Sequence, residues 1–245
     1  MRRALPTAAA VLALGAAAGG AIAAHGGNGR LPNGSETVHL NPADFATKID
    51  NPYWPMKPGT RWVYRETDSE GTRQKVVVTV TDRTKRIANG IAARVVQDVV
   101  TEKGQFVEVT DDWYAQDKRG NIWYLGEDTT EYENGKPLSK EGSFEAGVDR
   151  AQPGVIMPAH PRPGLAYRQE YYKGEAEDKA RIVSVREQAE VPAGHYRRVL
   201  MTRDWNPLDN KVLEFKFYAR GVGPVLAVSV SGGSDREELV RFKRG

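Results

Sequence analysis

Short segments rich in Val, Tyr, Trp and Phe, separated by turn residues, run through most of this 245-residue chain and constrain its fold more than any other feature. Apolar and polar residues alternate with period two at residues 76–80 and 213–217, and we expect Leu213, Phe215 and Phe217 to face the core. No apolar period of 3.6 lasts long enough for a helix of average length. Turns as short as those at Gly90 and Gly120 predict antiparallel neighbours, because parallel strands need a crossover of a dozen residues or more.

The predicted strands form two sets. The first covers residues 60–67, 73–82, 91–101, 105–116 and 121–126. The second covers residues 165–172, 178–186, 196–204, 211–219 and 224–230, with 236–242 as a closing strand.

Three short motifs recur along the chain at a nearly constant shift. The pairs are Pro58-Gly59 with Pro163-Gly164 at a shift of 105, Gly90 with Gly194 at a shift of 104, and Trp113-Tyr114-Ala115 with Phe217-Tyr218-Ala219, also at 104. Such constant register predicts an internal repeat. Repeat 1 would span about residues 58–126 and repeat 2 about 163–230, with an insertion at 127–162.

The two sets of strands have to cover each other, because a five-stranded sheet with one apolar face is not stable alone in water. We therefore predict an all-β fold, an antiparallel open barrel or a two-sheet sandwich of about ten strands from two repeated meanders. Residues 51–245 would form this single domain. The inward positions of such large curved sheets can enclose a ligand cavity.

The first residues predict export from the cytoplasm. Arg2 and Arg3 precede an apolar stretch from residue 8 to about 20, and the small-residue cleavage sites Ala21-Ile22-Ala23 and Ile22-Ala23-Ala24 follow. This is the pattern of a secretory signal peptide over residues 1–24, and an uncleaved anchor is the alternative. Residues 25–50, rich in Gly and Pro, predict a flexible linker. We expect a secreted or cell-envelope protein with no stable membrane span after cleavage.

Composition excludes several classes of protein. The chain has no cysteine, which rules out disulfides and acylation on a lipobox cysteine. Its net charge of +3 falls to +1 without residues 1–24, which hold two arginines and no acid. No run of five Lys or Arg occurs, so nothing in the sequence indicates a nucleic-acid partner.

No motif with a specific spacing indicates catalysis or metal binding. The four histidines lack the spacing of a zinc site, and Ser231 lacks the frame of a nucleophile elbow. Carboxylates are more suggestive, because they suit calcium or glycoside hydrolysis, although acidic clusters at hairpin ends are usually solvated turns. The candidates are Asp117, Glu127, Asp128, Glu175 and Glu177.

Aromatic residues supply the other candidates for a binding site. Adjacent aromatic residues such as Trp113 and Tyr114 must face opposite sides of a sheet, because side chains alternate along a strand. The rings that could line a pocket belong to Trp62, Trp113, Tyr114, Trp123 and Tyr167. Cross-strand packing is the alternative role for them.

Four stretches carry a resemblance to known proteins. They are DWYAQD at residues 112–117, GEDT at 126–129, GEAED at 174–178 and YARGVG at 218–223, and they resemble a group of exported bacterial β-rich proteins to which no activity is assigned. The likeness covers most of residues 50–242. The pattern is also loosely similar to the half-open barrels of periplasmic lipoprotein carriers, which implies an enclosed ligand.

Three functions remain open from the sequence. The first hypothesis is a secreted, non-catalytic protein that binds a small or amphipathic ligand in a β-barrel cavity, without a cofactor. The second is an exported hydrolase that uses the carboxylate cluster, with calcium as the one cofactor to consider. The third is a cell-surface interaction module.

Overall fold

A computed structural model describes residues 30–245, whose regular structure is almost entirely β-strand. The sole helical element of these residues is a short 3-10 turn, η1 (Pro42–Asp44). No helix in this part of the chain is long and apolar enough to cross a membrane. The predicted signal peptide, residues 1–24, lies outside the described residues.

The predicted strands are present. The first set appears as β2 (Arg61–Thr67), β3 (Arg73–Arg86), β4 (Ala92–Glu102), β5 (Gln105–Asp117) and β6 (Ile122–Glu133). The second set appears as β10 (Ala166–Arg168), β11 (Glu170–Tyr171), β12 (Lys179–Val191), β13 (Gly194–Asn206), β14 (Asp209–Ala219) and β15 (Gly223–Ser231), followed by β16 (Arg236–Lys243). Four shorter strands complete the fold, namely β1 (Phe45–Ala46), β7 (Lys136–Ser139), β8 (Phe144–Glu145) and β9 (Gln152–Met157).

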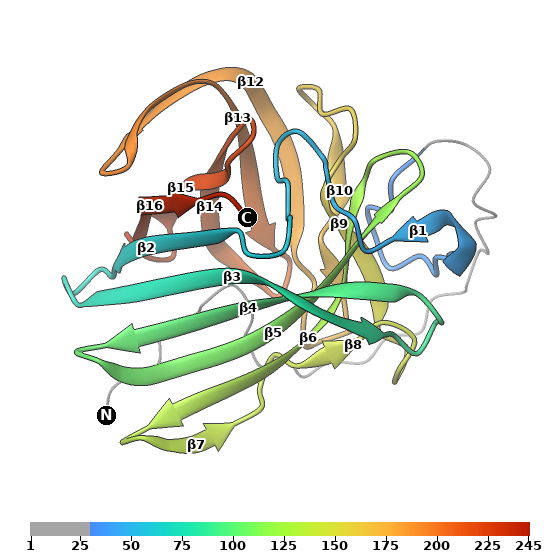
Figure 1. The fold of residues 1–245 in the computed structure, drawn as a ribbon, viewed down its shortest axis with the longest axis horizontal. Coiled ribbons are helices and arrows are strands. Elements are labelled where there is room, and N and C mark those ends of the chain that lie inside the picture. Colours follow the sequence, from blue (N-terminus) through green and yellow to red (C-terminus); the bar gives the residue numbers. More distant parts are fainter. Residues whose placement is uncertain (1–29) are drawn as a thin grey trace.

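These strands form one antiparallel sheet that curls into a nearly closed barrel (Figure 1). Its order is β10-β12-β13-β14-β15-β16-β2-β3-β4-β5-β6-β9-β11. The all-β antiparallel prediction is confirmed, and the barrel is the form adopted. The predicted number of about ten strands is too low, because thirteen lie on this path. The insertion contributes β9, the segment predicted as one strand at 165–172 divides into β10 and β11, and β16 joins the sheet.

Strand β16 joins the two meanders. It pairs with β15 on one side and with β2 on the other, where Glu238 lies opposite Arg65. The meander β2 to β6 and the run β10-β12-β13-β14-β15 follow the same antiparallel order, with Trp62 on β2 and Tyr167 on β10. Strand β11 lies apart from this run and pairs with β9. The internal repeat and the domain boundaries stay predictions.

One end of the barrel is closed by residues 49–57, a segment that we call the plug. The side-chain amide of Asn51 donates to the carbonyls of Gly120 and Pro158, at the ends of β5 and β9, over 2.9 and 3.2 Å. The carbonyl of Pro52 accepts a bond from the amide of Gly221, in the β14–β15 turn. This segment therefore holds strand ends from both meanders together.

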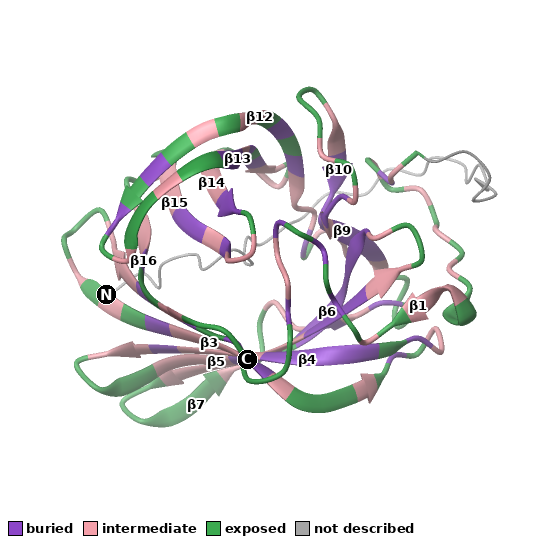
Figure 2. Cartoon of the chain, turned by 45° about the horizontal axis from the view of Figure 1, so that its top comes forward, coloured by how far each residue is buried: buried purple, intermediate pink, exposed green. Residues whose placement is uncertain are grey.

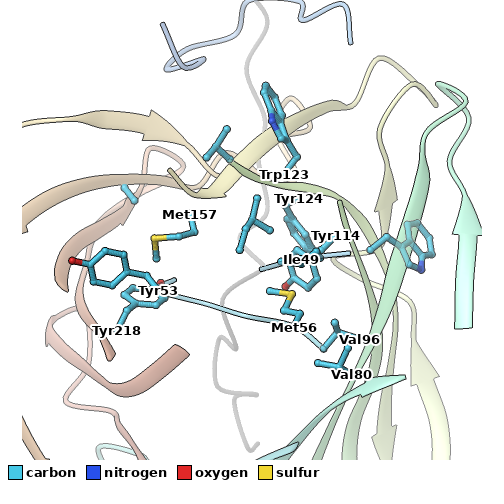
Figure 3. Packing of buried hydrophobic residues seen from close by; sticks show 14 of the residues in the cluster. Ile49, Tyr53, Met56, Val80, Val96, Tyr114, Trp123, Tyr124, Met157 and Tyr218 are labelled. Atoms are coloured by element: carbon cyan, nitrogen blue, oxygen red, sulfur yellow. The ribbon is translucent and has the colours of Figure 1, made fainter. Parts of the chain in front are cut away.

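The core lies under this plug. The buried Ile49, Tyr53 and Met56 pack in one cluster with Tyr114 and Tyr218 on the strands (Figure 3). Next to the plug, residues 93–96 of β4 and 122–127 of β6 are all buried (Figure 2). The hairpin tips at residues 69–71 and 103–105, at the far end of the barrel, are exposed. The barrel is therefore packed at one end and opens at the other.

Residues 32–36, within the predicted linker, lie against the barrel. Arg168 is fully buried, and its guanidinium donates to the carbonyls of Gly34 and Glu36 over 2.7 and 2.6 Å. Its backbone amide donates to the carbonyl of Pro32. Further along, β1 pairs with β5. Arg168 thus fixes the path of residues 32–36.

Candidate functional site

The barrel encloses a cavity of about 300 Å³. Its walls come from β2 to β6 and β14 to β16, with further residues from β9 and β11. The exposed Glu141 lies at its edge. Ligand pockets of small molecules start at about this size. The predicted insertion contributes to the wall through Glu127, Thr129, Glu141 and Ile156.

Aromatic rings line the part of the cavity next to the plug. Trp54 of the plug packs against Tyr114 and Tyr218, with ring centroids 5.9 and 5.8 Å apart, and Tyr114 stacks on Tyr124 at 5.1 Å. Trp62 donates its indole N–H to the carbonyl of Val222 over 2.8 Å. The hydroxyl of Tyr64 likewise donates to the carbonyl of Pro224. At Trp62 and Tyr64 the ring faces are therefore what remains to contact a ligand.

On β2, β5 and β14 charged residues follow aromatic residues on the cavity side of the strand. On β2 the inward positions are Trp62, Tyr64 and then Glu66, and on β14, from the closed end, Tyr218, Lys216 and Glu214. The cavity therefore changes from aromatic to acidic away from the plug. Eleven of the lining residues are acidic: Glu66, Asp98, Glu108, Asp112, Glu127, Glu141, Glu170, Asp178, Glu214, Asp235 and Glu237. Lys216 is the one basic residue among the described residues that line it.

Lys216 is already neutralised by neighbours. Its Nζ lies 3.1 Å from Oε2 of Glu214 and 3.4 Å from Oδ2 of the buried Asp204. Burial lowers the pKa of Lys216, but Glu214 and Asp204 outweigh this and raise it well above its usual value. Lys216 thus stays charged and forms its ion pairs with these two carboxylates. Burial raises the pKa values of Asp178 and Glu170, and the charge of Lys216 offsets this only in part.

A single tyrosine hydroxyl links two of the remaining carboxyl groups. Oη of Tyr124 lies 2.8 Å from Oδ1 of Asp112 and 2.7 Å from Oε2 of Glu127, which face each other across β5 and β6. A hydroxyl has one proton to donate, so both contacts are hydrogen bonds only when one carboxyl group is protonated. Burial raises the pKa of Asp112 to about 7 and that of Glu127 to about 8. The pair therefore holds a proton near neutral pH.

Burial also raises the pKa of other carboxyl groups in the cavity. Burial, reinforced by neighbouring acids, raises the pKa of Glu66 to about 7 and that of Glu237 well above its usual value. Oε1 of Glu170, a residue only 4% exposed, has no hydrogen-bond partner among the described residues, nor does Oδ1 of Asp98. Orphaned buried oxygens of this kind are costly unless a ligand, ion or water completes them.

Three of the residues predicted as a site line the cavity, namely Trp62, Tyr114 and Glu127. Trp113 and Asp128 instead border a shallow hollow on the outer face of the sheet. There, Nζ of Lys85 lies 3.6 Å from the centre of the Trp113 ring, and Lys140 forms an ion pair with Asp128. The opposite orientation of Trp113 and Tyr114 follows from the alternation of side chains along β5.

The other predicted residues lie outside the cavity. Asp117 organises the β5–β6 turn, where its carboxylate accepts the indole N–H of Trp123 over 2.9 Å. Tyr167 is fully buried. Glu175 and Glu177 belong to the hairpin between β11 and β12, and Glu177 accepts the amide of Gly174 over 3.0 Å. These residues are therefore not brought together with Glu127.

The sequence did contain a signal for the acidic residues that we missed. Glu66 follows the buried Trp62 and Tyr64 in phase, and Asp98 lies between Val96 and Val100 in the same way. A carboxylate at an inward position of a strand indicates a polar interior. On β14 our expectation was wrong for the cavity wall: Glu214, Lys216 and Tyr218 line the cavity, while Leu213, Phe215 and Phe217 alternate with them on the other face. Of these three, Phe217 still packs against the hydrophobic core.

Metal binding depends on how closely these oxygens converge. Within residues 30–245, no group of three or more His, Cys, Asp or Glu side chains is arranged so that it could hold a metal ion. The cavity carboxylates are instead spread over several strands.

Comparison with known proteins adds little to this picture. No protein-family model matches the chain, and no curated protein matches it. Among solved structures, the crystal structure of a "putative lipoprotein" from Parabacteroides distasonis is similar with 14% sequence identity and a TM-score of 0.44. The likeness covers 78% of this chain and 98% of that one.

Proposed function

We propose that this protein is an exported, non-catalytic binding protein that holds a small ligand inside its barrel. The observation that carries the proposal is the cavity of about 300 Å³, whose wall combines aromatic ring faces with buried carboxyl oxygens that have no partner within residues 30–245. Binding sites typically combine apolar surface with a few polar groups that orient the ligand. The aromatic end and the acidic wall of this cavity together suit an amphipathic molecule.

Export is part of the proposal and is supported by residues 1–24 alone. Arg2, Arg3 and the apolar stretch after them have the order of a secretory signal. We expect protein recovered from the envelope or medium of its host to begin near residue 25. Intact-mass measurement tests this, and a chain that keeps residues 1–24 would favour the anchor instead.

Native mass spectrometry tests ligand binding directly. Protein purified from its own host should carry a small molecule that is released on denaturation. A blocking variant makes the test specific: Val78→Phe places a ring in the cavity wall, whereas Val77→Phe places the same ring on the opposite face of β3. We expect the adduct to be lost in Val78→Phe and kept in Val77→Phe. Wild-type protein without an adduct, and without a thermal shift against a panel of small molecules, would contradict the proposal.

One observation favours a second candidate, a carboxylate hydrolase. Asp112 and Glu127, bridged by Tyr124 and with pKa values raised to about 7 and about 8, have the protonation range of a general acid and base. Glu127→Gln would then abolish hydrolysis of aryl glycosides that the wild type cleaves. Absence of hydrolysis by the wild type across such substrates eliminates this candidate.

A further inference from the structure

We propose that the ligand of this cavity is a small organic oligoamine, a molecule with an apolar backbone and two or more protonated amine groups. This inference rests on the proposed function and assigns the chemical class of its ligand. Recognition would be shared between the carboxylates of the wall and the aromatic rings near the plug.

Neighbouring residues on three strands carry the argument. Acidic residues occupy adjacent positions at Asp111-Asp112 on β5, Glu127-Asp128 on β6 and Glu237-Glu238 on β16, with one side chain facing out and the other facing the cavity. These pairs allow the same residue types to be compared on the two faces of one sheet.

Each outward member has a basic partner within the protein. Asp111 forms a two-pronged ion pair with Arg83, with both distances 2.7 Å. Glu238 accepts bonds from Arg65 at 2.7 Å and lies 3.0 Å from Arg236. Asp128 pairs with Lys140. The sheet therefore compensates its outer carboxylates.

The inward members have no such partner. Among the described residues, no ion pair reaches Asp112, Glu127 or Glu237. Lys216, the one lysine among the described residues of the wall, forms its ion pairs with Glu214 and Asp204. A buried carboxylate that stays ionised needs a cation or several hydrogen-bond donors nearby. Among the described residues, Asp112 and Glu127 have tyrosine hydroxyls but no cation, so a bound cation would stabilise their ionised forms.

The buried oxygen of Glu170 is an independent sign of a missing partner. Glu170 is 4% exposed, it lines the cavity, and its Oε1 has no donor among the described residues. Glu170 lies on β11, away from the three acidic pairs in the chain. Ammonium groups, which carry several N–H donors and no acceptor, would satisfy such an oxygen.

The distribution of the acids favours an extended organic cation over a metal ion. No three of them converge as metal ligands in residues 30–245, whereas Glu66, Asp112 and Glu237 come from three different strands. Several separated carboxylates match several separated ammonium groups. The rings of Trp54, Tyr114 and Tyr218 add surfaces that attract cations and cover an alkyl chain.

Three probes of equal length test the charge requirement. Isothermal titration of the dialysed protein would compare 1,8-octanediamine, 1,8-octanediol and octanedioate, which have eight-carbon chains with cationic, neutral or anionic ends. We expect the diamine to bind about tenfold or more tightly than the diol, with an affinity that falls as salt rises, and octanedioate not to bind. Equal or tighter binding of the diol or of octanedioate would overturn the oligoamine assignment while leaving a ligand-binding barrel in place.

Matched variants locate the contact. The double variant Asp112→Asn/Glu237→Gln should weaken diamine binding at least about tenfold, whereas Asp111→Asn/Glu238→Gln, one residue away on the same strands, should change it less than about twofold. Circular dichroism confirms that both are folded. Equal losses in both would place the diamine on the outer surface and contradict the proposal.

Two further results separate this inference from the proposed function. If none of the probes binds but native mass spectrometry finds a ligand, that ligand decides the matter: an amine supports the assignment and a molecule without one refutes it. If CaCl₂ displaces the diamine at equal concentration, the site prefers a metal ion and the assignment fails. If no probe and no native ligand binds, the proposed function fails with it.

Discussion

The two faces of the barrel sheet treat the same residue types in opposite ways. On the outer face Asp111 is held by Arg83, while on the inner face its neighbour Asp112 meets Tyr124 and other acids. In the three acidic pairs the outer carboxylate forms an ion pair with a basic side chain, whereas no ion pair among the described residues reaches the inner one. Sites that depart from the internal consistency of a fold are where function is expected, because stability alone would have removed such acids.

The largest consequence of this contrast should be an unusual dependence of stability on pH. Burial raises the pKa of Glu66, Asp112 and Asp178 to about 7 and that of Glu127 to about 8. The folded state then binds more protons than the unfolded state between about pH 4 and pH 8, so the free energy of unfolding falls as pH rises through that window. We expect a loss of roughly 3 kcal/mol or more between pH 5 and pH 8, because a difference of one in pKa corresponds to about 1.4 kcal/mol.

Urea denaturation at fixed salt measures this dependence. The outer Glu238 affects stability in the opposite sense. Burial raises its pKa, but its bonds to Arg65 and Arg236 outweigh this and lower the pKa. Its contribution to the free energy of unfolding is therefore lost only in acid. Stability should thus be greatest near pH 5, and saturating 1,8-octanediamine should flatten the decline above it. A free energy of unfolding that rises from pH 5 to pH 8 would refute the contrast between the faces.

Substitution of the adjacent aspartates should change stability with opposite signs. Asp112→Asn removes a buried charge and keeps an acceptor for Tyr124, so the unliganded protein should gain roughly 2 kcal/mol at pH 8. Asp111→Asn breaks the ion pair with Arg83, and because that arginine is half exposed the loss should be at most about 1 kcal/mol. Urea unfolding of both variants provides the measurement, and a loss in both would show that the inner acid is structural.

The smallest expected effect concerns the hydroxyl of Tyr124. Tyr124→Phe removes the donor that stabilises the ionised forms of Asp112 and Glu127, so the pH midpoint of diamine binding should rise by about half a unit. Tyr64→Phe is the control, since that hydroxyl donates to the neutral carbonyl of Pro224. Titration calorimetry at several pH values distinguishes them, and an equal rise in both variants would remove Tyr124 from the proposed role.

The sequence predicted the strands well because alternation and glycine turns are local signals. It could not give their number, because β9 and β11 are short and acquire their pairing only from strands far along the chain. The plug at residues 49–57 could not be predicted either, because Asn51 bonds to Gly120 and Pro158, which are distant in the sequence.

For the site, the sequence identified Trp62, Tyr114 and Glu127 through residue type, and the structure places these three in the cavity wall. It could not separate Glu127 from Asp117, because only the fold shows that Asp117 bonds within its own turn. On β14, the usual assumption that apolar residues face inward fails, since the interior there is polar and the outer face is half-buried.

The pairing of β16 with β2 has a consequence for how the chain reaches its native state. The bond from Arg65 to Glu238 joins residues 173 positions apart. The backbone N–H and C=O groups on that edge of β2 therefore have no strand to pair with until residues 236–243 have been synthesised. Until then that edge is open to pairing with a strand of another chain. Closure of the barrel therefore depends on β16 and cannot precede its synthesis.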